Sequence, residues 1–154
     1  LDRMGALGTS QGSVGAINTY MRQDEEGTID TVLANALPAG TWVSDEDTYN
    51  PASIHVPLFI VGGTQDGVIA PAKHSFRVLA QVQADGRSIA AHRIGAGHLQ
   101  IAGDGGLYRG YVTAWMLDQL VGDEDAAAVF APQTGELFGN EAWTEIEVQE
   151  PVDL

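Results

Sequence analysis

The chain has 154 residues, of which 44% are hydrophobic and 18% charged, and its formal net charge is −14 at pH 7. This length and composition describe one globular domain, residues 1–154, with enough apolar residues to bury a core, and they exclude a disordered chain. So acidic a surface repels nucleic acid and anionic membranes, and we expect neither as a partner. The sequence has no cysteine, which excludes disulfides, thiolate nucleophiles and cysteine-ligated metals.

Apolar runs and helical periodicities alternate along the chain. Strands are expected over residues 3–7, 29–37, 58–63 and 88–94. Helices are expected over residues 12–23, 72–83 and 107–120, with a further helical turn at 126–130. Residues 41–57 are polar and rich in turn formers, which predicts an exposed loop, and residues 143–148 alternate like a strand. The order predicts an α/β fold with a mostly parallel sheet of about four strands flanked by helices.

A serine between two glycines follows the first expected strand directly, in Gly8-Thr9-Ser10-Gln11-Gly12. At a strand-to-helix turn this pattern is typical of the nucleophile elbow of α/β-hydrolases. The two glycines are expected to keep side chains out of a tight turn in which Ser10 takes a strained backbone conformation. Because so short a motif also arises by chance in a glycine-rich chain, the residues further along must decide its meaning.

A serine nucleophile needs an imidazole base, and the base needs a carboxylate that fixes its tautomer. In α/β-hydrolases these groups follow in the order Ser, Asp or Glu, His, each after a strand. Asp66 comes just after the strand 58–63, and His98 follows the strand 88–94 in a glycine-rich turn. Taken alone, Asp66 is also a common turn residue before Gly67, and His98 a surface-loop histidine. Their order behind Ser10 favours a catalytic triad.

The remaining histidines are expected to be structural or solvated, because none ends a strand; they are His55, His74 and His92. The sequence contains no metal-ligand spacing, such as two histidines four residues apart on a helix. No pair of carboxylates can be assigned to glycosidase chemistry either. We therefore expect no metal and no cofactor.

Four segments resemble the C-terminal half of the polyester hydrolases, the cutinase-like and poly(ethylene terephthalate)-hydrolysing esterases related to dienelactone hydrolases. They are residues 8–12, 56–66, 95–98 and 111–116. Shorter similarities at residues 70–71, 74–75 and 122–125 extend the resemblance over about residues 4–130. The resemblance implies an α/β-hydrolase-like fold and a secreted serine esterase that acts on carboxylic esters, polyesters included, through an acyl-enzyme.

The resemblance also implies the role of each site residue. Ser10 would be the nucleophile, His98 the base and Asp66 the group that orients it. The backbone N–H of Gln11 would be one oxyanion donor, a role in which its side chain does not matter. Two further residues would line the substrate cleft, Trp42 and Val68. The residues before Trp42 fit the family pattern imperfectly, so a loop aromatic that simply packs down is the alternative for Trp42.

One departure from the family concerns the strands that precede the elbow there. One of them leads to the loop that gives the second oxyanion donor, and we expect a truncated fold without it. Residues 4–7 would then form an open sheet edge, which natural proteins avoid. We expect another chain to cover this edge, most simply a twofold mate, unless the chain is a processed fragment.

Two alternatives to a polyester hydrolase stay open on the sequence. One is a small-molecule esterase, lactonase or dienelactone-type hydrolase. The other is a binding or assembly module that keeps the fold without the chemistry, because a fold does not guarantee an activity.

Overall fold

The computed structural model describes residues 3–23, 27–101 and 105–152. It contains a five-stranded sheet with the strands in sequence order: β1 (Met4–Thr9), β2 (Ile29–Asn35), β3 (Leu58–Gly63), β4 (Ser88–Arg93) and β5 (Trp143–Gln149). Strands β1 to β4 are parallel, and β5 runs antiparallel to β4. The expected α/β fold with a mostly parallel sheet is confirmed. The sheet has five strands rather than four because the alternating segment near the C-terminus pairs with β4.

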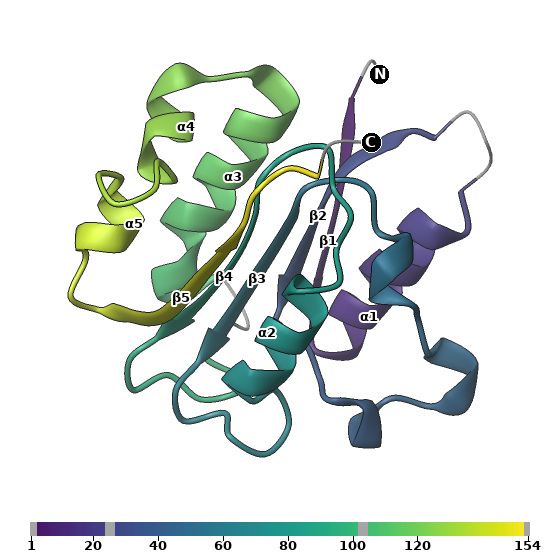
Figure 1. Cartoon of the computed structure of the whole chain (residues 1–154). Helices are drawn as coiled ribbons and strands as arrows, with labels where there is room; N and C mark the ends of the chain where they lie inside the picture. The colour runs from purple at the N-terminus through teal and green to yellow at the C-terminus, as the bar shows by residue number, and fades with distance from the viewer. Residues whose placement is uncertain (1–2, 24–26, 102–104, 153–154) are drawn as a thin grey trace.

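Helices cover both faces of the sheet (Figure 1). Two of them, α1 (Gln11–Met21) and α2 (Ala72–Leu79), pack on one face. The other face is covered by α3 (Arg109–Val121), α4 (Glu124–Val129) and the short α5 (Glu136–Gly139). Every residue of the central strand β3 is buried, as expected for an unbroken apolar run in a sheet covered on both sides. The carboxyl ends of β1, β3 and β4 therefore lie at one fixed edge of the sheet.

Element boundaries differ from the expected ones where turns interrupt the periodic pattern. Helix α2 ends at Leu79, four residues early, because the chain then forms tight turns in which the Gln81 N–H donates to the Val78 carbonyl. Strand β2 ends at Asn35 because Ala36 takes a left-handed conformation, with φ of 49°. The expected loop 41–57 contains short 3₁₀ turns, at Gly40–Trp42, Asp45–Asp47 and Pro51–Ser53.

The strand that precedes Ser10 lies at one edge of the sheet. Within residues 3–23, 27–101 and 105–152, β1 pairs only with β2. Its apolar side chains are partly open to solvent, with Met4 40% and Leu7 49% exposed. The expectation of an open edge is thus confirmed. In the same described ranges, no helix combines the length and the apolar character that crossing a bilayer requires.

His92 lies in the middle of β4 and is completely buried. Its Nδ1 lies 3.1 Å from the Glu145 carbonyl and its Nε2 lies 3.2 Å from Oγ of Ser75. Because a carbonyl only accepts, Nδ1 carries the proton and Nε2 accepts from the Ser75 hydroxyl. Burial lowers the pKa of His92 below its ordinary 6.5, although the nearby carboxylates of Glu145, Asp66 and Glu147 act in the opposite direction.

We expect this buried histidine to make the protein less stable in mild acid. Below pH 6.5 the unfolded chain binds a proton that folded His92 does not, so the free energy of unfolding falls as the pH drops from 6.5 toward the lowered folded pKa. One such group contributes at most about 1.4 kcal/mol per pH unit. Urea unfolding of the parent and of His92→Gln at pH 7.5, 6.5 and 5.5 measures this contribution. The free energy of unfolding of the variant should fall less steeply with decreasing pH than that of the parent. An equal slope in both proteins would contradict this assignment.

Candidate active site

Ser10 lies in the turn between β1 and α1 with φ of 56° and ψ of −123°, a conformation that residues other than glycine rarely adopt. Its N–H donates to the Asn35 carbonyl at 2.9 Å, and its carbonyl accepts from the Ser13 N–H at 2.8 Å. The residue stands at the N-cap position of α1, yet its side chain makes no capping bond. The hydroxyl is thus free of the helix and turns to another partner.

The two glycines of the motif differ in how tightly they are held. A Cβ atom on Gly8 would lie 1.8 Å from the carbonyl oxygen of Gly12, so only glycine fits there. A Cβ atom on Gly12 would meet nothing within 4 Å outside the backbone of its own helix. The expectation that both positions exclude side chains is thus correct for Gly8 and wrong for Gly12.

The hydroxyl of Ser10 joins a chain of hydrogen bonds that ends at a buried carboxylate. Oγ of Ser10 lies 2.7 Å from Nε2 of His98, and Nδ1 of His98 lies 2.5 Å from Oδ2 of Asp66. Because Asp66 accepts from Nδ1–H, the neutral ring presents the lone pair of Nε2 to the Ser10 hydroxyl. The structure thus brings together the three residues of the predicted triad, from the ends of β1, β3 and β4.

The side chains of Asp66 and His98 are much more buried than those of ordinary loop residues. The side chain of Asp66 is only 3% exposed and that of His98 is 16% exposed. The second carboxylate oxygen of Asp66, Oδ1, accepts from the Ala70 N–H at 3.2 Å. Asp66 does stand in a tight turn, since its own N–H donates to the Gly63 carbonyl at 3.0 Å. Its carboxylate nonetheless points inward, toward His98, rather than into solvent.

The loops that hold Asp66 and His98 are bonded to each other. The Gln65 N–H donates to the Ala96 carbonyl at 2.9 Å, and the Gly95 N–H donates to Oγ1 of Thr64 at 2.9 Å. Gly95 has φ of 75°, which lets its turn double back toward the sheet. These bonds fix the carboxylate and the imidazole relative to each other, and the sequence order alone gave no sign of them.

The backbone N–H of Gln11 lies next to the nucleophile. Gln11 is the first residue of α1, so its N–H is among the helix amides that have no intrahelical acceptor, as an oxyanion donor requires. Its side chain has a separate task, because Nε2 donates to the Trp42 carbonyl at 2.5 Å. The glutamine side chain thus holds the segment that contains Trp42 against the turn.

The two predicted cleft residues lie together beside this turn. The indole Nε1 of Trp42 donates to the carbonyl of Val68 at 3.1 Å, although the two residues are far apart in the sequence. Trp42 is 48% exposed and Val68 74% exposed, so neither packs into the core. Leu99, which sequence reasoning missed, is 73% exposed and directly follows His98. Its position next to His98 in the sequence could have marked it as an apolar residue beside the triad.

The hollow that His98 lines is small, about 10 Å³, and a separate pocket of about 240 Å³ is lined by Thr9, Asn35 and Ile101. An apolar pocket of about 220 Å³ opens elsewhere, between α2 and residues 38–51. No group of three or more His, Cys, Asp or Glu side chains that could hold a metal occurs in the part of the chain that the structure describes.

Neither the models of known protein families nor the curated proteins match this chain. The class of the protein therefore rests on its geometry. It is an α/β protein with a mostly parallel sheet, and a hydrogen-bonded Ser–His–Asp arrangement lies at the carboxyl edge of that sheet.

Proposed function

We propose that this chain is a serine hydrolase of carboxylic esters, with Ser10 as nucleophile, His98 as general base and acid, and Asp66 as the group that orients the imidazole. The observation that carries the proposal is the continuous hydrogen bonding from Ser10 through His98 to the buried Asp66. A serine hydroxyl is a poor nucleophile unless an oriented base removes its proton, and this arrangement supplies that base.

The reaction follows from the positions of the protons. Oγ of Ser10 attacks the ester carbonyl while Nε2 of His98 takes the hydroxyl proton, and the Gln11 N–H stabilises the oxyanion that forms. His98 then gives the proton to the departing alcohol, which leaves an acyl-enzyme on Ser10. Water, deprotonated by His98, attacks the acyl group and releases the carboxylic acid. Asp66 accepts from Nδ1–H throughout and stabilises the imidazolium.

The surroundings of the triad support a bulky apolar ester, such as a polyester of the cutin or poly(ethylene terephthalate) type. Three large apolar side chains are exposed on segments that flank the triad, Trp42, Val68 and Leu99. Exposed apolar side chains can contact part of a long chain, whereas a small substrate is usually enclosed in a pocket. A small-molecule esterase or dienelactone-type hydrolase is the alternative, and it would leave a polyester film intact while hydrolysing soluble esters.

Hydrolysis of p-nitrophenyl butyrate tests the proposal. The parent chain is expected to release p-nitrophenol, and the Ser10→Ala variant is not. A catalytically silent module, the second candidate, would give no difference between the two proteins. The edge position of β1 motivates this second candidate: β1 pairs only with β2 among the described residues, whereas in the hydrolases that the sequence resembles an earlier strand leads to the loop with the second oxyanion donor. Loss of one such donor costs about 10²- to 10³-fold in rate.

We further propose that a second copy of the chain covers β1 by twofold strand pairing. The exposed Met4 and Leu7 and the unpaired edge motivate this assignment, because an open apolar edge favours association. Light scattering at micromolar concentration is expected to give twice the 16.3 kDa mass of the chain. A single species at the mass of one chain would contradict the proposed pairing.

A further inference from the structure

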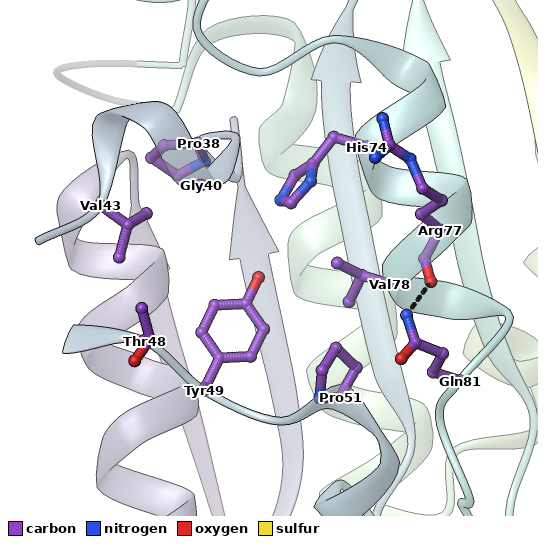
Figure 2. A pocket seen from close by; sticks show the side chains of 10 residues that line it. All are labelled: Pro38, Gly40, Val43, Thr48, Tyr49, Pro51, His74, Arg77, Val78 and Gln81. Atoms are coloured by element: carbon purple, nitrogen blue, oxygen red, sulfur yellow. Dashed lines mark hydrogen bonds between the residues drawn. The ribbon is translucent and has the colours of Figure 1, made fainter. Parts of the chain in front are cut away.

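The apolar pocket of about 220 Å³ lies away from the triad, on the sheet face that α1 and α2 cover. One wall is formed by α2, which contributes His74 and Val78, and by Gln81 in the turn after it; the opposite wall is the irregular segment from Pro38 to Pro51 (Figure 2). The volume exceeds the roughly 150 Å³ that suffices for a benzene ring in an engineered cavity. The pocket is therefore large enough for one substituted aromatic ring.

Two polar atoms of residues that line this pocket have no hydrogen-bond partner among the described residues. They are the hydroxyl of Tyr49 and Nε2 of His74, and both are buried. Figure 2 shows that the Tyr49 hydroxyl points toward the imidazole of His74 across the pocket. Buried polar groups in folded proteins are nearly always hydrogen-bonded, so an unpartnered pair that faces the same space can take up one further hydrogen-bonding group, a water or a ligand hydroxyl.

The protonation of the two groups defines what that ligand group must be. Burial and the neighbouring Arg77 lower the pKa of His74, so its ring is neutral at pH 7, although the backbone of Pro38 acts in the opposite direction. Because Nε2 has no partner, the Pro38 backbone faces Nδ1, and Nε2 is the nitrogen left to accept. Burial raises the pKa of Tyr49, so its hydroxyl keeps its proton and can donate. A single hydroxyl group both donates and accepts. A carboxylate cannot donate to Nε2, and an ammonium cannot accept from Tyr49.

We propose that the pocket between α2 and residues 38–51 binds a small neutral phenol or ring alcohol, whose hydroxyl donates to Nε2 of His74 and accepts from the hydroxyl of Tyr49. The apolar walls, Val43 and Val78 among them, contact the ring. Both polar atoms are shielded from solvent, so the proposal requires the Tyr49 side chain to turn when the ligand hydroxyl enters between it and His74. This site is separate from the triad and does not depend on the proposed ester hydrolysis.

Calorimetric titration of the Ser10→Ala variant of this chain with three methylbenzenes that differ in the group opposite the methyl tests the site. The ligands are p-cresol, toluene and p-toluate. We expect p-cresol to bind about tenfold or more tightly than toluene, because two hydrogen bonds distinguish them. Equal binding of p-cresol and toluene would overturn the proposal, and so would tighter binding of p-toluate, which would indicate an anion held by Arg77.

Tyr49→Phe and His74→Leu provide the matched variants. Each is expected to reduce the preference for p-cresol over toluene several-fold while toluene binding stays the same. Without ligand, Tyr49→Phe should leave the Tm unchanged or raise it, because it removes only an unpartnered hydroxyl. A fall in Tm together with an unchanged preference for p-cresol would mean that Tyr49 and His74 bond to each other, and would refute the ligand site.

Discussion

Replacing Ser10 by alanine is expected to lower kcat/KM for p-nitrophenyl butyrate by at least about 10⁴-fold, since the residues of such a triad act as a unit. The variant keeps its imidazole and carboxylate but has no atom to form the acyl-enzyme. His98→Ala should cost about as much, and the double variant no more than either single one. Asp66→Asn should lower the rate by about 10⁴-fold, because an amide in place of the carboxylate favours the wrong tautomer of His98.

Two controls separate chemistry from folding. Ser44→Ala changes an exposed serine at the N-cap of the 3₁₀ turn Asp45–Asp47, outside the triad, and should retain the parent rate. Circular dichroism and the urea midpoint of each variant should match those of the parent. If Ser10→Ala hydrolyses the ester as fast as the parent, the proposed mechanism is wrong.

Gly8→Ala is expected to destabilise the fold by about 3 kcal/mol or more, because overpacking against rigid atoms ranks among the costly substitutions. The added Cβ would lie 1.8 Å from the carbonyl oxygen and 2.1 Å from the carbonyl carbon of Gly12, and 2.6 Å from the Ser13 nitrogen. All three are backbone atoms, so no side-chain rotation relieves the contact. The strained turn at Ser10 would have to open.

Gly12→Ala is the matched control at the other end of the motif. Its Cβ meets nothing within 4 Å beyond its own helix, and it lies in α1, where alanine is favoured over glycine by roughly 0.5–1 kcal/mol. In urea unfolding, the midpoint of Gly8→Ala should therefore lie below that of the parent and the midpoint of Gly12→Ala above it. Equal midpoints for Gly8→Ala and Gly12→Ala would show that the turn is not packed as described.

The strands and the order of the site residues could be predicted from the sequence because they follow from strong local patterns. The apolar run of β3 and the alternation of β5 each determine an element, and parallel strands place Asp66 and His98 at one edge. The antiparallel pairing of β5 with β4 was not predictable, because alternation gives a strand no direction. The short α5 was also missed, since four residues show no helical period.

The contacts made by the irregular segment between β2 and β3 could not be predicted from the sequence. Its 3₁₀ turns have no periodic signal in the sequence. Neither the hydrogen bond from Trp42 to Val68 nor the position of Tyr49 in the lining of the pocket could therefore be derived. His74 was expected to be structural or solvated, and its place in the pocket depends on where this segment packs against α2. The bonds between the loops of Asp66 and His98 are likewise set by tertiary packing rather than by local sequence.

Labelling by a fluorophosphonate tests the central claim most directly, because the probe reacts only with an activated serine. Incubation of the parent chain, followed by intact-mass and peptide analysis, is expected to give a single adduct on Ser10. The adduct should be absent from Ser10→Ala and strongly reduced in His98→Ala, and Ser44→Ala should be labelled like the parent. A parent chain that stays unlabelled, or one labelled equally after His98→Ala, would contradict the assignment of Ser10 as a nucleophile activated by His98.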